Sequence, residues 1–65
     1  MKISYFNDTD TLYIEFSSKD IVETRDLDEN TLLDVDAMGN ICAITVEHAS
    51  DRADVSRLVV AGIAA

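Results

Sequence analysis

The sequence predicts a small α+β domain: an antiparallel β-sheet of about five hairpin-connected strands, followed by a C-terminal helix. Three observations predict this fold. Apolar and polar residues alternate over most of the chain, turn-forming residues separate the alternating runs, and the period of the apolar residues changes after residue 50. Because 65 residues suffice for one domain only, we expect a single domain over 1–65. The sheet would occupy 1–47, and a helix or tail would occupy 51–65.

The first two predicted strands form a hairpin. Residues 2–6 and 11–16 show the period-two alternation of half-buried strands. Between them, residues 7–10 are Asn, Asp, Thr and Asp, and Asn and Asp side chains favour turns because they hydrogen-bond the nearby backbone. The apolar residues expected to share a face are Ile3 and Tyr5 in the first strand, and Leu12, Ile14 and Phe16 in the second.

The next three predicted strands differ in polarity. Residues 21–27 are mostly polar, which suits an edge or a solvent-facing position. Residues 31–36 alternate, and residues 41–47 are apolar on both faces, so we expect the latter strand to be central or covered on both sides. Gly39 is suited to a positive φ and is predicted to close the hairpin between these two strands.

The C-terminal residues predict a helix that covers one face of the sheet or docks on a second subunit. Asp51 can cap this helix, with Ser50 and Asp54 as alternatives. Residues 58–61 could instead form a short strand, and Gly62 weakens a helix by about 1 kcal/mol relative to alanine. The apolar residues at the helical spacing of three and four are Val55, Leu58, Val59, Gly62 and Ile63.

The composition restricts the possible partners. The chain carries 13 acidic and 5 basic residues, a net charge of -8, yet it is 48% hydrophobic and therefore too apolar for a disordered acidic tail. This charge disfavours nucleic acids and anionic membranes, because both present phosphate groups that would repel it. Basic proteins are the partners that such a surface attracts. The alternative is that the acidity only maintains solubility.

The chain offers no covalent or metal crosslink that would stabilise so small a core. Cys42 is the only cysteine and His48 the only histidine, which excludes an internal disulfide and a Cys/His zinc site. We therefore expect oligomerisation, most simply a homodimer, to supply the missing burial. No signal peptide or membrane-spanning segment is recognisable, and a cytoplasmic location with a reduced thiol is predicted.

One turn resembles the start of a calcium-binding loop. Asp34 and Asp36 are two positions apart, a glycine occupies the sixth position, and Asn40 the seventh. However, Met38 stands where the third oxygen ligand should be, and Thr45 replaces the bidentate glutamate at position twelve. The pattern therefore favours a hairpin turn, with Asp34, Asp36 and Asn40 as weak candidate ligands and no metal site predicted.

Acidic turn residues are the main candidates for binding a partner. If the strands follow one another in a simple meander, alternate turns lie at the same end of the sheet, and their carboxylates gather there. The alternative is that they are ordinary solvated turn residues. An aromatic side chain on the face opposite the predicted core adds a further candidate, unless the C-terminal helix covers that face. The candidates are Asp8, Asp10, Tyr13, Asp28 and Glu29.

No catalytic residues and no cofactor are predicted. His48 and Cys42 are the side chains most reactive near neutral pH, but they are six positions apart, roughly 20 Å along a regular strand. Cys42 is expected to be a small core residue. Ser50 cannot form a familiar triad with His48 through local spacing.

The order and spacing of several short motifs resemble a short bacterial family catalogued as domain of unknown function 2283, over residues 1 to about 50. Asn7 and Met38 depart from the usual pattern. The resemblance implies a small β-rich protein without assigned catalytic residues. Some members are neighbours of genes that resemble toxins, which implies an antitoxin-like protein holding a basic partner encoded nearby. The motifs are Lys2-Ile3-x-Tyr5, Asp10-x-Leu12-Tyr13-Ile14, Glu23-Thr24, Leu33-Asp34-Val35-Asp36-x-x-Gly39-Asn40 and Ile44-x-Val46-x-x-Ala49-Ser50.

Two functions follow from these observations. The first is an acidic protein-interaction module that binds a basic partner. The alternative is a metal- or small-ligand-binding β-domain that uses the turn containing Asp34 and Asp36.

Overall fold

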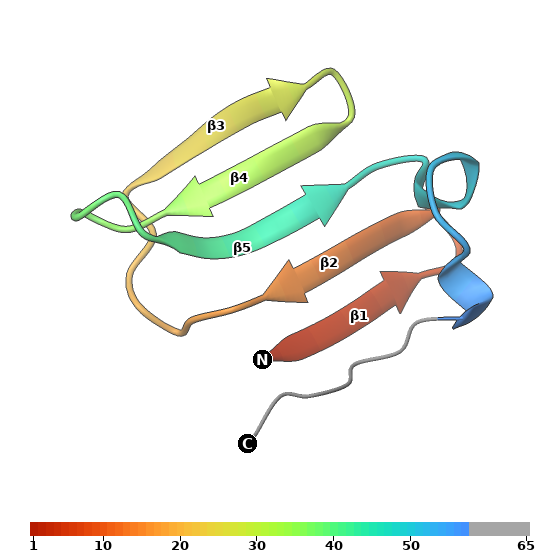
Figure 1. The fold of residues 1–65 in the computed structure, drawn as a ribbon, viewed down its shortest axis with the longest axis horizontal. Helices are drawn as coiled ribbons and strands as arrows, with labels where there is room; N and C mark the ends of the chain where they lie inside the picture. Colours follow the sequence, from red (N-terminus) through yellow and green to blue (C-terminus); the bar gives the residue numbers. More distant parts are fainter. Residues whose placement is uncertain (58–65) are drawn as a thin grey trace.

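A computed structural model of the protein describes residues 1–57, which form one five-stranded antiparallel sheet (Figure 1). Each strand is five or six residues long, an ordinary length for a small sheet. Two short 3-10 turns, η1 and η2, follow the sheet. The elements are β1 (Lys2–Phe6), β2 (Thr11–Glu15), β3 (Glu23–Asp28), β4 (Thr31–Val35), β5 (Ile41–Val46), η1 (Ala49–Asp51) and η2 (Val55–Arg57).

The strand order is β1-β2-β5-β4-β3, which differs from the simple meander assumed for the gathering of the acidic turns. The last strand, β5, is inserted between the β1–β2 hairpin and the β3–β4 hairpin. Its sequence ICAITV is apolar on both faces and suits a central strand, in which Cys42 and Ala43 are each only 1% exposed. Strand β3 lies at one edge and all six of its residues are exposed. The structure thus confirms both the edge position of the polar third strand and the central position of the fifth.

The connection from β2 to β3 runs along one end of the sheet to the opposite edge. It passes the start of β5, where the backbone N–H groups of Phe16 and Ser17 donate to the Cys42 carbonyl at 2.7 and 3.1 Å. It then passes the end of β4, where the Val22 N–H donates to the Val35 carbonyl at 2.9 Å. These bonds satisfy backbone groups that would otherwise end unpaired at the sheet boundary.

The register places the apolar residues of four strands on one face, called here the aliphatic face. Residues directly opposite each other in an antiparallel pair lie on the same side of the sheet. Ile14, for example, lies opposite Ile3 of β1 and opposite Ile44 of β5. The predicted alternation of β1, β2 and β4 is therefore confirmed, although β2 ends at Glu15 and does not include Phe16. The aliphatic face consists of Ile3, Tyr5, Leu12, Ile14, Leu33, Val35, Ile44 and Val46.

The opposite face, called here the polar face, mixes polar and apolar side chains. Tyr13 lies at its centre, directly opposite Ser4 on β1 and Thr45 on β5. A register shift between β4 and β5 leaves Cys42 as an extra residue, so that Ile41 lies opposite Val35 rather than continuing the alternation. The polar face consists of Lys2, Ser4, Tyr13, Glu15, Thr24, Asp26, Leu32, Asp34, Ala43 and Thr45.

Over residues 51–57 no helix follows the sheet, so the prediction of an α+β fold with a C-terminal helix is wrong for the part of the chain that the structure describes. This part contains only the end of η1 and the turn η2, and 58–65 lie outside the described residues. The side chains expected to cap the helix are used differently. Ser50 donates its hydroxyl to Asp10 at 2.6 Å. The Asp54 carboxylate accepts the Ser56 hydroxyl at 2.6 Å and the Ser56 N–H at 3.2 Å, and the second of these is the bond of an N-cap at the start of the 3-10 turn η2.

Within residues 1–57, the model contains no helix with the length and apolar character needed to cross a membrane.

The turn between β4 and β5 yields the first prediction. Gly39 has φ +83°, a left-handed conformation, and no heavy atom lies within 4 Å of a Cβ built on it. A side chain there meets no obstacle, so only the backbone conformation opposes it. We expect Gly39→Ala to lower the free energy of unfolding by about 1–2 kcal/mol. Gly39→Asn should cost less, because Asn tolerates the left-handed region. Urea unfolding followed by circular dichroism measures both, and equal losses would contradict the backbone explanation.

Candidate functional site

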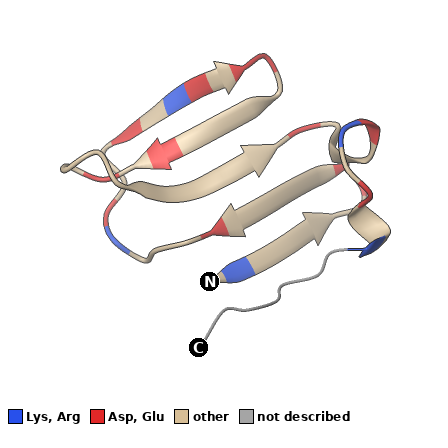
Figure 2. Cartoon of the chain, in the orientation of Figure 1, with Lys and Arg blue, Asp and Glu red and all other residues tan. Residues whose placement is uncertain are grey.

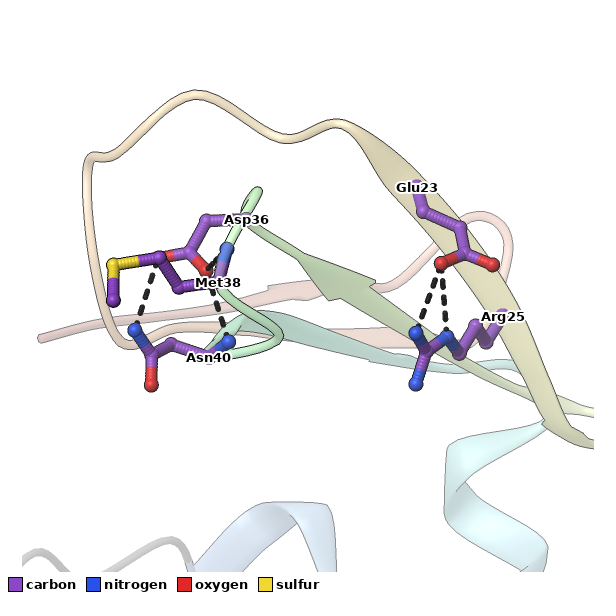
Figure 3. Close-up of polar contacts among 5 residues, drawn as sticks. All are labelled: Glu23, Arg25, Asp36, Met38 and Asn40. Atoms are coloured by element: carbon purple, nitrogen blue, oxygen red, sulfur yellow. Dashed lines mark hydrogen bonds and ion pairs between the residues drawn. The ribbon is translucent and has the colours of Figure 1, made fainter.

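Both oxygens of the Asp36 carboxylate accept hydrogen bonds within the β4–β5 turn. Asp36 is only 7% exposed. Its Oδ1 atom accepts the backbone N–H groups of Met38 and Asn40, both at 2.9 Å, and its Oδ2 atom accepts the Asn40 side-chain amide at 3.3 Å (Figure 3). These donors, the Asn40 N–H above all, hold the pKa of Asp36 below its ordinary value. The carboxylate therefore stabilises the turn.

The second aspartate of this turn is bonded elsewhere. The Oδ1 atom of Asp34 accepts the Thr24 hydroxyl at 2.7 Å, across the β3–β4 pair on the polar face. Asn40, the third candidate ligand, donates its side-chain amide N–H to Asp36. Nowhere in residues 1–57 do three or more His, Cys, Asp or Glu side chains gather in a way that could hold a metal ion.

The other end of the sheet contains the most connected polar groups of the structure. We call it the turn end, because the β1–β2 and β3–β4 turns both lie there, together with the end of β5 (Figure 1). The gathering of these two turns at one end was expected only if the strands formed a meander. It occurs here with a different strand order, because antiparallel pairing throughout preserves the alternating strand directions.

Asp10 joins the β1–β2 turn to the chain that follows β5. Its carboxylate accepts the Tyr5 hydroxyl at 2.5 Å, the Ser50 hydroxyl at 2.6 Å and the Ser50 N–H at 3.1 Å. Its backbone carbonyl accepts the Ala49 N–H at 2.9 Å. Asp10 and His48 both have φ +52°, a conformation that lets the two chain segments meet. We call Tyr5, Asp10 and Ser50 the Asp10 cluster.

Asp28 joins the β3–β4 turn to the same segment. The Arg52 guanidinium lies 3.1 Å from the Asp28 carboxylate and donates to the Thr31 hydroxyl at 2.6 Å. The Asn30 N–H donates to the Asp28 carboxylate at 2.9 Å, and the Asn30 carbonyl accepts the Glu47 N–H at 2.7 Å. Residues 47–52 are therefore bonded to both hairpin turns.

The hydrogen bonds shift the pKa values of these groups. The Ser50 hydroxyl, followed by the Tyr5 hydroxyl, lowers the pKa of Asp10 because both donate to the ionised carboxylate. The hydrogen bond between Tyr5 and Asp10 also raises the pKa of Tyr5, because the neutral hydroxyl is the form that donates to the carboxylate. The pKa of Asp28 is lowered mainly by the Asn30 N–H. Both carboxylates thus bear a negative charge at neutral pH.

The Asp10 cluster does not have the geometry of a catalytic triad. In a triad, a histidine lies between the nucleophilic hydroxyl and the carboxylate. Here the Ser50 hydroxyl donates directly to Asp10. The lowered pKa of Asp10 also makes it a weak base. Cys42 is buried, and burial raises the pKa of its thiol, which disfavours the nucleophilic thiolate.

The predicted partner-binding residues fall into two groups. Asp10 and Asp28 hold the turn end together, and Tyr13 is half-buried on the polar face. Asp8 and Glu29 are exposed. Sequence reasoning missed the pairing of Asp10 with Ser50, because these residues are 40 positions apart and no local pattern connects them.

A second group of carboxylates lies along the free edge of the sheet (Figure 2). We call Glu23, Asp26, Asp28 and Glu29 the acidic edge. Arg25 is the one basic residue within it, and it forms an ion pair with Glu23 at 3.0 Å, shown in Figure 3. All four acidic residues are exposed. Asp28 is paired with Arg52, so Asp26 and Glu29 present the carboxylates best able to contact a partner.

Comparison with known families places the chain. The family model described as "Protein of unknown function (DUF2283)" matches residues 2–50. The chain belongs to this family. The DUF2283 match ends at Ser50, the residue that closes the Asp10 cluster, so the matched segment contains all five strands and the bond that joins the end of β5 to the first turn. No curated protein and no solved structure matches the chain.

The Asp10 cluster predicts how stability depends on pH. The folded pKa of Asp10 lies below its ordinary value of 3.8, so the ionised carboxylate stabilises the fold above about that pH. This contribution is lost as the pH falls through 3.8 toward the folded pKa. We expect Asp10→Asn to lower the stability at pH 7 and to weaken its decline below about pH 4. Thermal unfolding between pH 2 and pH 7, in steps of about one unit, measures both effects.

Asp8→Asn is the matched control, because Asp8 lies in the same turn and is exposed. It should leave both the stability at pH 7 and the acid dependence nearly unchanged. Equal effects of the two substitutions would contradict the role assigned to the Asp10 cluster.

Proposed function

We propose that the protein is a non-catalytic interaction module that binds a basic partner protein through its acidic edge. The acidic edge carries four carboxylates and one arginine, and the arginine is already paired with Glu23. This concentration of exposed negative charge on one strand and its turn is the observation that supports the proposal. Such a surface accelerates association with a positively charged partner and selects against acidic ones.

The position of the acidic edge also supports this function. Strand β3 is an edge strand whose side chains are all exposed, so a partner can reach it without any rearrangement of the sheet. Charged side chains and the irregularity between Asp26 and Asp28 discourage pairing of β3 with another strand. Recognition would therefore rest on side-chain charge and not on strand addition.

The remaining chemistry supports binding in preference to catalysis. The Ser50 hydroxyl and the Asp10 carboxylate are bonded to each other, and the Cys42 thiol is buried. An antitoxin-like role is the specific form we propose, in which the module covers the basic surface of a partner encoded nearby. The free thiol of Cys42 fits a reducing compartment such as the cytoplasm.

The proposal predicts that charge reversal on the acidic edge weakens binding to the product of the adjacent gene. We expect Asp26→Lys combined with Glu29→Lys to raise Kd at least about tenfold, with most of the change in the association rate. Added salt should weaken the wild-type complex, because exposed charges are screened. Surface plasmon resonance at low and high NaCl measures both effects.

The control variant combines Asp8→Lys with Asp20→Lys, which changes the net charge by the same amount at exposed positions outside the acidic edge. It should bind almost as tightly as the wild type. Equal weakening by the two variants would show that only the overall charge matters, and the absence of binding by the wild-type protein would refute the proposal.

A further inference from the structure

The aliphatic face has an apolar row that the described residues leave partly open. This row crosses β1, β2, β5 and β4, and each of its residues lies directly opposite the next: Ile3, Ile14, Ile44 and Leu33. All four side chains are half-buried, including those on the inner strands β2, β5 and β4.

The face is buried at both ends of the sheet. At the opposite end from the turns Val35 is only 3% exposed, and at the turn end Leu12 and Thr31 are buried and Ala49 is completely inaccessible. The Arg52 side chain crosses to Thr31 at the turn end. Toward the middle of the sheet, the packing among the described elements is that of neighbouring strands within one layer.

Among the described residues the sheet forms a single layer. The extents of the molecule are 33 × 32 × 17 Å, and the shortest axis is viewed end-on in Figure 1. A sheet with one apolar face is stable when that face packs against a second layer, and two sheets pack about 10 Å apart. The chain exposes 4817 Å², whereas a compact protein of its 7.2 kDa exposes about 4100 Å². The surplus, about 700 Å², is close to the roughly 800 Å² that each partner contributes to a standard interface.

We propose that the aliphatic face binds the same face of a second copy of this chain, forming a two-layer β-sandwich. A symmetric dimer requires a self-complementary surface. The apolar row can pack against itself, and at its β3 margin Arg25 lies opposite Leu33 while Glu23 lies opposite Val35. This margin therefore carries one positive and one negative group, which can face the opposite charges of the second copy.

The charge distribution favours a second copy on this face. Two chains of net charge -8 repel each other. However, Asp26, Asp34 and Glu15 project from the polar face, which points away from the proposed interface. The sandwich thus keeps these three carboxylates of one copy away from those of the other. Asp26 projects from the polar face and Glu29 lies in the β3–β4 turn, so the two acidic-edge residues best able to contact a partner stay accessible, and this inference does not depend on the proposed function.

Light scattering on a size-exclusion column tests the dimer directly. We expect twice the chain mass for the wild-type protein and a melting temperature that rises with protein concentration, because dissociation accompanies unfolding. The dimer should persist at about 1 M NaCl, since salt screens charges and does not weaken apolar contacts. A partner complex held by the acidic edge would weaken under the same conditions, so the two proposals can fail separately.

Ile44→Asp and Thr45→Asp are matched variants, because these neighbours on β5 lie on opposite faces. We expect Ile44→Asp to raise the dimer Kd at least about a hundredfold, since the substitution occurs twice in the symmetric interface. Thr45→Asp should remain dimeric. If Ile44→Asp does not fold, Ile44→Thr keeps a β-branched residue while reducing the apolar area, and it should raise the dimer Kd about tenfold or more.

Three results would overturn the inference. A wild-type monomer would show that the face is covered within one chain, and a dimer that dissociates in high salt would show a charged interface. A dimer equally tolerant of substitutions at Ile44 and Thr45 would place the contact elsewhere, for example at the free edge of β1.

Discussion

Strand β5 holds the two halves of this sheet together, because β1 pairs with β2, β3 pairs with β4, and β5 pairs with both β2 and β4. An isolated two-stranded hairpin is only marginally stable in water. The two hairpins therefore depend on the last strand of the chain for a common sheet. The near-complete burial of Cys42 and Ala43 reflects this position, since side chains on both faces of β5 have neighbours on either side.

The polar groups at the turn end reinforce the same arrangement. Residues 47–52 follow β5 directly and bond to the β1–β2 turn through Asp10 and to the β3–β4 turn through Asp28. Asp10 and Asp28 look like ordinary turn residues in the sequence. In the fold, their carboxylates fix the end of the central strand. The pKa values of both carboxylates are lowered, because the fold stabilises their ionised forms.

The acidic residues have two different roles in this structure. Asp10 and Asp36 are occupied by internal hydrogen bonds, whereas Asp26 and Glu29 extend from an exposed edge. The aliphatic and polar faces are equally distinct. The proposed dimer face and the proposed partner-binding residues Asp26 and Glu29 lie on different parts of the same small sheet.

The sequence by itself determined the five strands, the side-chain alternation of β1, β2 and β4, the polar edge strand and the apolar central strand. These features depend on residues close together in the chain, whose period of two is visible without a structure. Only the tertiary structure decided the strand order, the bond between Asp10 and Ser50, and the irregular backbone of residues 52–54. The apolar spacing after Ser50 favoured a helix, but Ser50 bonds Asp10 and Arg52 pairs with Asp28. Local sequence patterns do not predict these features, because the features depend on contacts between segments that are 20 to 40 residues apart.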